Sequence, residues 1–513
     1  MRTIAIILWA QLWLPLLLHA APPFVLESQR RDFVSGEVVR RPELIDPAKT
    51  VVVVIDMWDR HWCKTYTERV ANLVPRMNET VAAARRLGIQ VVWAPSDVAN
   101  FYADYPQRKK MKALPAHQEP ATVALQPAPP PEGLDCCECG PSRPCRSHAA
   151  WTRQQAGLTI AEGDLIGDCN EARELYNLCA ERGIDTVIYM GVASNMCVCH
   201  RAFGMLNARR HGLRVFFVRD LVEAITANGI HPATRQADPN FTPAKGTART
   251  EHYLEQHVAA SVASRQLIAT AGQGAFAQDP RPRIVFVIAD DEYKTDQTLP
   301  EFARRHLAAD FQLVYCLARG NEPKKRNDLP GLEALYDADL VVLSVRRRAL
   351  PVAQMDFLER YLRSGQPLVA LRVSVVPFQV EGKDCPEGHV IWRDFDQEVL
   401  GCHYQGYPAE SRETGCDVWT VASAKGHPIL KGLETARLHS RSWLYRQRPL
   451  AGSTTVLWQG RWSDREPEEP VAWTQVHEGG RVFYTTLGCE ADFQEEAFNR
   501  ILRNAIHWAL GRE

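Results

Sequence analysis

The sequence predicts an α/β protein built from two open parallel-sheet domains in tandem, each with helices on both faces of its sheet in three α/β/α layers. Apolar β-branched runs alternate with helical stretches along most of the chain, which is the pattern of strands buried on both faces. The 513 residues exceed what one hydrophobic core usually organises. A segment rich in Gly, Ala and Pro at residues 271–282 separates two series of alternating elements, and this composition indicates a linker.

The first predicted domain covers residues 47–270. Its opening unit is a strand at 51–55, a helix at 71–87 and a strand at 89–93, an order that predicts a right-handed βαβ unit. Later elements alternate in the same way: helix 170–182, strand 186–191, helix 197–211, strand 214–219, helix 251–260 and strand 266–268.

An insertion interrupts this alternation at residues 100–152. The segment is rich in Pro and has neither helical nor strand periodicity, so we expect an irregular insertion near the site. It holds a cysteine cluster consisting of Cys136, Cys137, Cys139 and Cys145. In an exported protein this cluster favours disulfides, with a metal site as the alternative.

The second predicted domain covers residues 283–511. Strands are expected at 283–289, 311–316, 338–345 and 367–373, and helices at 302–309, 355–363 and 497–510. Strands that alternate with helices again predict an open parallel sheet.

Residues 1–21 have the pattern of a secretory signal peptide. Arg2 precedes an apolar run at 4–18, and the small pair Ala20 and Ala21 follows. We therefore expect export to the periplasm or the exterior, with no membrane attachment after the signal is removed; a retained anchor is the alternative.

The charge balance excludes classes of partner. Lys plus Arg number 60 and Asp plus Glu number 61, so no global field attracts nucleic acid. A small-molecule substrate fits this balance better, and a second copy of the chain is a further candidate partner.

Asp56 and Cys197 are the candidate catalytic pair. Asp56 follows the strand at 51–55, and Cys197 begins a helix directly after the strand at 186–191 and the loop GVASNM. Ligands bind beyond the carboxyl ends of parallel strands. A helix N-terminus favours a thiolate, and the backbone amides of Ala193 and Cys197 could hold an oxyanion. Asp56 could move the proton.

These residues carry a family resemblance. The runs VVVVIDMWD, GIDTVIYMGVASNMCV and VFFVRD, with Arg201 on the helix after Cys197, resemble the isochorismatase-like cysteine hydrolases over residues 50–268. The resemblance implies an Asp–Lys–Cys triad and a cis peptide between Val192 and Ala193. The family Lys is missing, because no lysine occurs between Ala113 and Ala244. Arg153 is our candidate replacement, with Lys109, Lys110 and Lys112 as alternatives.

The segment after Asp56 suggests further ligand contacts. Nicotinamidase-like relatives bind a divalent metal through an Asp-x-His pair, which implies a metal hypothesis for Asp59 and His61. The alternative is that His61 lines the pocket and that Trp58 and Trp62 form its apolar walls. We expect that no cofactor is required.

The second domain resembles the ThuA-like (trehalose utilisation) domains, relatives of class I glutamine amidotransferases. The resemblance rests on YDADLVVLSV, SGQPLVALRV, FDQEVLGCHY and GRVFYTTLG. Arg372 stands where the amidotransferase nucleophile would lie, and a guanidinium is not a nucleophile. Arg372 could bind a carboxylate or a sugar hydroxyl with His403 nearby, or it could form a buried ion pair with Glu292 or Asp291.

The combined hypothesis is an exported hydrolase of a C–N bond in a small amide-like substrate, with Cys197 as nucleophile and an accessory ThuA-like domain. The alternative is a catalytically degenerate exported protein in which both domains bind small or carbohydrate-related ligands. Two features favour the alternative: the absence of the family Lys, and the presence of Arg372 at the position of the nucleophile.

Overall fold

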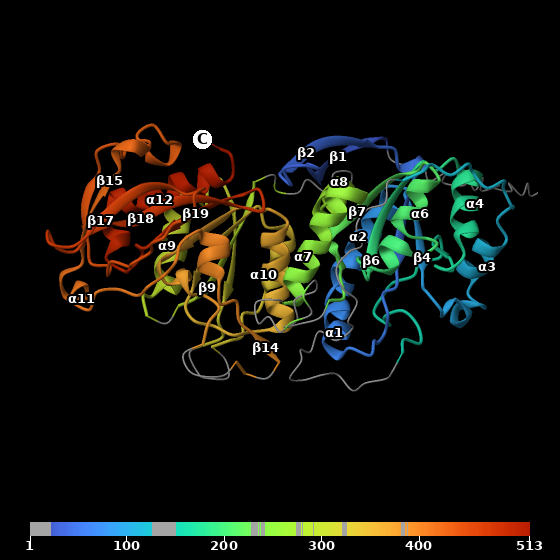
Figure 1. The fold of residues 1–513 in the computed structure, drawn as a ribbon, viewed down its shortest axis with the longest axis horizontal. Coiled ribbons are helices and arrows are strands. Elements are labelled where there is room, and N and C mark those ends of the chain that lie inside the picture. The colour runs from blue at the N-terminus through green and yellow to red at the C-terminus, as the bar shows by residue number, and fades with distance from the viewer. Residues whose placement is uncertain are drawn as a thin grey trace, which may run out of the picture.

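The computed structural model confirms the α/β class. It describes residues 22–125, 150–226, 234, 236, 242–272, 279, 281–290, 292–320, 326–380, 385–386 and 388–512. Within these residues, one sheet has eight strands and a second has nine, and helices flank both sheets (Figure 1). The expected signal peptide at 1–21, the four-cysteine cluster and most of the linker at 271–282 lie outside the described residues.

The first sheet has the strand order β2-β1-β8-β7-β6-β3-β4-β5. Its strands are β1 (Phe24–Arg31), β2 (Val38–Ile45), β3 (Thr50–Ile55), β4 (Gln90–Ala94), β5 (Leu165–Ile166), β6 (Thr186–Val192), β7 (Arg214–Glu223) and β8 (Ala260–Val262). The run from β8 to β5 is parallel, whereas β1 pairs antiparallel with β8 and with β2. The sheet therefore starts before the predicted boundary at residue 47, because β1 and β2 extend its edge.

The helices of this half differ from the sequence expectations in several places. They are α1 (Lys64–Asn72), α2 (Val74–Arg86), α3 (Pro106–Lys112), α4 (Ala172–Arg182), α5 (Cys197–His200), α6 (Met205–Arg210), α7 (Pro243–Tyr253) and α8 (Ser264–Gly272). The predicted helix at 71–87 is two helices, and the one at 197–211 breaks before α6. The predicted strand at 266–268 is wrong, since these residues lie in α8. The insertion at 100–152 is not wholly irregular, because it contains α3.

The second sheet has the order β10-β9-β11-β13-β19-β18-β17-β15-β16. Its strands are β9 (Arg283–Ala289), β10 (Gln312–Leu317), β11 (Leu340–Val345), β13 (Leu368–Leu371), β15 (Cys416–Thr420), β16 (Arg437–Ser440), β17 (Thr455–Arg461), β18 (Glu469–His477) and β19 (Gly480–Thr485). The strands from β10 to β19 are parallel, and the remaining four join antiparallel. The sheet is therefore mixed, where the sequence predicted a parallel one.

The longer helices of the second half lie beside this sheet. They are α9 (Thr295–His306), α10 (Val352–Arg363) and α12 (Glu496–Ala509), with the single turn α11 (Ser411–Thr414). The short strands β12 (Leu350–Pro351) and β14 (His389–Val390) form a separate pair. In the described chain, no helix is long and apolar enough to cross a membrane.

The two halves meet along α10. This helix lies beside α1 and α7 of the first half (Figure 1). Charged side chains cross the junction at several points, including Arg76 with Asp337 (2.6 Å) and Arg265 with Asp339 (2.9 Å). Each half also has its own apolar core on its own sheet. The side chains that meet at the junction are therefore charged, whereas the apolar clusters lie within each half.

Candidate active site

Asp56 lies at the carboxyl end of β3, inside the first domain. The strand before it is completely buried, and the backbone of Asp56 turns into the left-handed region with φ 47°. Its carboxylate accepts hydrogen bonds from the amide of Ser96 (2.5 Å) and from the Ser96 hydroxyl (2.6 Å). Burial raises the pKa of Asp56 to about 6 despite these bonds. Asp56 is therefore a carboxylate at neutral pH that can take up a proton within a small pH change.

Cys197 lies next to Asp56. It is the first residue of α5, and β6 pairs with β3 so that Ile55 faces Gly191. Cys197 is 4% exposed, and the Asp56 carboxylate and the Arg201 guanidinium are the charged groups that act on its thiol. Burial, followed by the Asp56 charge, raises the pKa of this thiol to about 12, whereas Arg201 lowers it. The predicted catalytic pair therefore shares one environment, and its thiol is protonated in the resting state.

Arg201 is the cation at this site. It lies four residues after Cys197, and its guanidinium also donates to Asn170 Oδ1 (3.0 Å) and pairs with Asp97 (3.3 Å). Although burial lowers it, the Cys197 contact and the nearby carboxylates raise the pKa of Arg201. The sequence resemblance included Arg201 without assigning it this position. The helical spacing of four residues from Cys197 was the signal that could have identified it.

Three of the four cations proposed from the sequence contact other groups, and Lys112 is exposed on α3. The Arg153 guanidinium lies over the Phe101 ring at 5.9 Å, and its backbone bonds to Asp59. Lys109 pairs with Asp104 (3.4 Å), and Lys110 donates to the Glu162 carbonyl (3.3 Å). These contacts place Arg153 directly after the insertion, beside Phe101 and Asp59, whereas Arg201 is the cation that acts on the thiol.

The loop at 192–197 presents backbone amides beside the sulfur. The peptide between Val192 and Ala193 is cis, as the sequence resemblance implies. The amides of Met196 and Val198 donate to the Ala193 carbonyl at 3.0 and 3.1 Å. In the described chain, the amides of Ala193 and Cys197 have no backbone acceptor. These two amides are the pair that the sequence suggested for an oxyanion.

Two further residues at this site were missed by sequence reasoning. Ser96 follows β4 and holds Asp56 as described above. Cys169 follows β5 and is 0% exposed, and burial together with the Asp56 charge raises its pKa well above the ordinary value. Ser96 follows β4, which pairs with β3, and Cys169 follows β5, which pairs with β4, so their position after a parallel strand was the available signal.

An aromatic cluster adjoins the Asp56–Ser96 pair. Trp58 stacks on Trp151 at 4.4 Å between ring centroids, and His61 lies 3.8 Å from Trp62. The Trp151 indole donates to the Ser96 carbonyl (3.1 Å), which ties the cluster to the candidate site. Trp58 is 3% exposed, and Trp62 is partly buried. Trp58 and Trp62 thus belong to one aromatic cluster beside the candidate site.

The two suggested metal ligands have protein partners. The Asp59 carboxylate accepts from the Thr152 amide (2.9 Å) and hydroxyl (2.6 Å), and His61 Nδ1 accepts from the Cys63 amide (3.1 Å). Burial lowers the pKa of His61 to about 4. Across the described ranges, no group of three or more His, Cys, Asp or Glu side chains could hold a metal ion. The metal hypothesis therefore finds no third ligand there.

Arg372 and His403 lie in the second domain. Arg372 follows β13 with φ 44° and is 1% exposed, and its guanidinium lies over the rings of Tyr293 (4.2 Å) and Tyr445 (5.1 Å). His403 is exposed, and its neighbour Tyr404 contacts the Tyr445 ring. The Arg372 guanidinium is thus enclosed by aromatic rings, which differs from the predicted alternative of an ion pair.

The carboxylates proposed for that ion pair are engaged elsewhere or not described. Glu292 pairs with Arg346 (2.6 Å), and Asp291 lies outside the described residues. The amidotransferase-like position after β13 thus holds a buried cation.

Solved structures with a similar fold share little sequence identity with this chain. A search of curated protein sequences found no match. Among solved structures, a ThuA-like protein from Parabacteroides merdae is 16% identical, with 45% of this chain and 90% of that chain covered and a TM-score of 0.34. N-carbamoylsarcosine amidase from Thermoplasma acidophilum is also 16% identical, with 42% and 96% covered and a TM-score of 0.24. An isochorismatase family protein from Burkholderia thailandensis is 16% identical, with 40% and 97% covered and a TM-score of 0.22.

A family model matches within the second half of the chain. The model is described as ThuA, trehalose utilisation, and the match covers residues 320–509, from the end of β10 to the end of α12. Residues 320–509 of this chain therefore form a ThuA domain.

Proposed function

We propose that this protein is an exported hydrolase that cleaves a C–N bond of a small amide-like substrate through Cys197. The observation that carries the proposal is that the paired strands β3 and β6 place the buried Cys197 thiol beside the buried Asp56 carboxylate, with the Arg201 guanidinium near enough to act on the same thiol. An acid–base group and a cation beside a thiol are what attack on an amide carbonyl requires.

The chemistry follows from the position of each group. The Cys197 sulfur attacks the carbonyl carbon while its proton passes to Asp56, and the carbonyl oxygen becomes an oxyanion. The free amides of Ala193 and Cys197 stabilise that oxyanion. When the C–N bond breaks, the protonated Asp56 gives its proton to the leaving amine. Water activated by the Asp56 carboxylate then hydrolyses the thioester and restores the thiol.

The substrate and location follow from features outside this pair. The aromatic wall with Trp58 and Trp62 favours a small, flat or apolar group attached to the amide. Balanced charge gives no support to a nucleic-acid substrate. The pattern at residues 1–21 supports export. The ThuA domain has an accessory role in this proposal, with Arg372 and His403 as its candidate ligand-binding residues.

An amidase assay with matched variants tests the proposal. Ammonia release is measured with nicotinamide-type and carbamoyl amides for the full chain, for Cys197→Ala and for Cys179→Ala, a buried thiol on α4. We expect turnover by the wild type and by Cys179→Ala, and none by Cys197→Ala. Turnover that survives in Cys197→Ala would rule out Cys197 as the nucleophile.

One observation favours the alternative of a ligand-binding protein without catalysis. Burial raises the pKa of the Cys197 thiol to about 12, far from the range of an activated nucleophile. Alkylation of Cys197 by iodoacetamide at pH 7, compared between the wild type and Asp56→Asn, distinguishes the two functions. In the hydrolase Asp56 takes up the thiol proton during attack, so the variant should be alkylated more slowly, whereas equal or faster alkylation of the variant supports the binding protein.

A further inference from the structure

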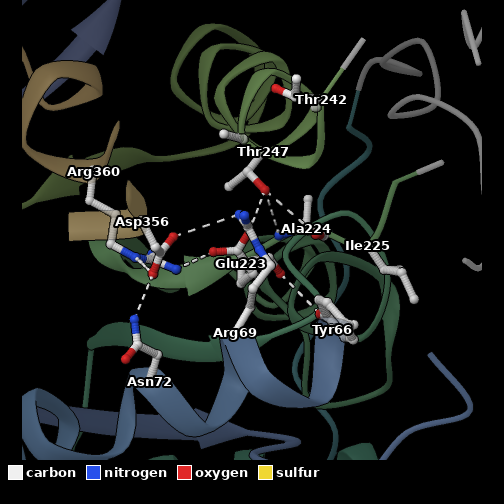
Figure 2. A network of polar contacts seen from close by, with 12 residues as sticks. Tyr66, Arg69, Asn72, Glu223, Ala224, Ile225, Thr242, Thr247, Asp356 and Arg360 are labelled. Atoms are coloured by element: carbon white, nitrogen blue, oxygen red, sulfur yellow. Dashed lines mark hydrogen bonds and ion pairs between the residues drawn. The ribbon is translucent and has the colours of Figure 1, made fainter. Parts of the chain in front are cut away.

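A buried group of four charges joins the ThuA half to the first domain. Glu223 is the last residue of β7, and its carboxylate is 0% exposed. Figure 2 shows this carboxylate between the side chains of Arg69 from α1 and Arg360 from α10. Asp356, one helical turn before Arg360, accepts from Arg360 Nε (2.9 Å) and lies 3.7 Å from Arg69. Two acids and two guanidinium groups therefore neutralise each other across the junction.

Arg360 contacts the end of β7 at two points. Its Nη1 donates to the Val222 carbonyl (3.1 Å) while its Nη2 pairs with the Glu223 carboxylate. Thr247 on α7 adds a hydrogen bond to the same carboxylate (2.6 Å). Arg69 and Arg360 together hold the pKa of Glu223 below its ordinary value, although burial alone would raise it. The strand end is thus held by one guanidinium from its own domain and one from the other.

The other side of this strand end holds the candidate catalytic loop. The Glu223 carbonyl accepts from the Ser194 amide (2.7 Å), and β7 pairs Val192 with Glu223. The Asn195 side chain exchanges two hydrogen bonds with the backbone of Ile225, at 2.7 and 3.1 Å. Ser194 and Asn195 lie between Ala193 and Cys197, whose amides are the candidate oxyanion donors. One residue, Glu223, therefore connects the domain junction to the loop.

We infer that Arg360 of the ThuA half is a positioning residue for the loop at 192–197, acting through Glu223. The inference rests on the proposed role of Cys197. Buried, fully bonded charge networks hold a single arrangement, and removal of one partner leaves an uncompensated buried charge. Without Arg360, the Glu223 carboxylate keeps one guanidinium and is drawn toward solvent, and the backbone that holds Ser194 moves with it. Solvent then reaches Cys197, so its thiol ionises at lower pH.

Alkylation of Cys197 tests this inference without a known substrate. The rate of iodoacetamide modification is followed by site-resolved mass spectrometry between pH 6 and 10 in the full chain, in Arg360→Met and in Arg363→Met. Arg363 is the matched control because it lies on the same helix, is 8% exposed and bonds across the junction to the Ala244 carbonyl (3.2 Å). In Arg360→Met we expect alkylation about tenfold faster at pH 8 and a lower pH midpoint. Arg363→Met should stay within about twofold of the wild type.

Equal alkylation rates in Arg360→Met and Arg363→Met would contradict the inference. If Arg360→Met does not fold, Arg360→Lys and Arg363→Lys replace the pair, because lysine lacks the planar fork with which Arg360 bonds Val222 and Glu223 through separate nitrogens. Arg360→Lys should then react faster than Arg363→Lys, and equal rates contradict the inference. The amidase assay is separate: absence of turnover by the wild type removes the hydrolase but leaves this comparison of rates intact.

Discussion

Asp56 and Cys197 lose their protons at widely separated pH values. The pKa of Asp56 is about 6 and that of Cys197 about 12, and burial is the first cause of both shifts. At neutral pH the pair therefore consists of a carboxylate and a thiol, with Arg201 contacting the sulfur. This arrangement favours transfer of the thiol proton to Asp56 during attack, because a stable thiolate next to a buried carboxylate would be costly.

Replacement of Asp56 by Asn should raise stability and abolish hydrolysis. A carboxyl whose folded pKa exceeds its unfolded value adds stability below pH 3.8, and that contribution is lost as pH rises through about 6. At pH 7 the buried carboxylate costs about 3 kcal/mol, so the neutral amide should increase the free energy of unfolding by up to that amount. Urea unfolding of the wild type and Asp56→Asn at pH 7 and pH 4.5 measures this difference. If the variant gains as much free energy of unfolding at pH 4.5 as at pH 7, the buried charge of Asp56 is not the cause.

Loss of Arg201 should impair the site more than loss of Arg153. The positive charge of Arg201 lowers the thiol pKa, so Arg201→Met raises that pKa and slows amide turnover by about tenfold for each pKa unit. Arg153→Met is the control, because its guanidinium lies over Phe101. Turnover and alkylation are measured for both variants. A larger loss of turnover in Arg153→Met than in Arg201→Met would show that Arg153 is the catalytic cation.

At the scale of elements, the closest approach at the site is between β3 and β6. A Cβ on Gly191 would lie 1.9 Å from the Ile55 carbonyl oxygen, and Gly191 has φ 107°. Only glycine allows this contact. It brings the end of β6, and therefore Cys197, next to Asp56.

Gly191→Ala should separate these two strand ends. We expect a loss of at least about 2 kcal/mol in the free energy of unfolding, since the clash is with backbone atoms, together with loss of turnover. Gly163→Ala is the control, because a Cβ there has nothing within 4 Å. Thermal unfolding and amide turnover are compared for the two variants. Wild-type turnover in Gly191→Ala would show that the site tolerates a wider gap between the strands.

Long buried elements could be predicted from the sequence, and short or edge elements could not. The strands β3, β6 and β9 are apolar after their first residue, so their extent can be recognised in the sequence; Asp56 directly follows β3, and Cys197 follows β6 after a short loop. The strand β8 has three residues between two helices, too few for any period. The sequence therefore predicts the strand a few residues later, within what is α8. The polar strands β1 and β2 lie at an edge and show little apolar alternation.

The burial of charged residues at the domain junction could not be predicted from the sequence, for a physical reason. Its residues, such as Arg69, Glu223 and Arg360, are charged and would ordinarily be assigned to the surface. They are buried because residues far apart in the chain neutralise each other, and such pairing has no local signature.

Two protonatable acids belong to the same junction: burial raises the pKa of Glu359 to about 7 and that of Glu251 to about 8.

The raised pKa values of these two acids predict that the free energy of unfolding of the whole molecule falls in mild alkali. Their folded pKa values exceed the unfolded value of 4.5, so the stability they contribute is complete below that pH and is lost as pH rises through about 7 to 8. Glu251 is 6% exposed and lies 3.5 Å from Arg363, which offsets its charge only in part.

Glu251→Gln should therefore flatten the fall in unfolding temperature between pH 6 and pH 9. The variant stays neutral where the wild type must ionise a buried group at a cost of up to about 5 kcal/mol. Glu162→Gln, at an exposed turn, is the control and should follow the wild type. Calorimetry across this pH range gives the comparison. Parallel curves for Glu251→Gln and the wild type would mean that Glu251 is already ionised at the junction at pH 6, with its charge balanced by the neighbouring arginines.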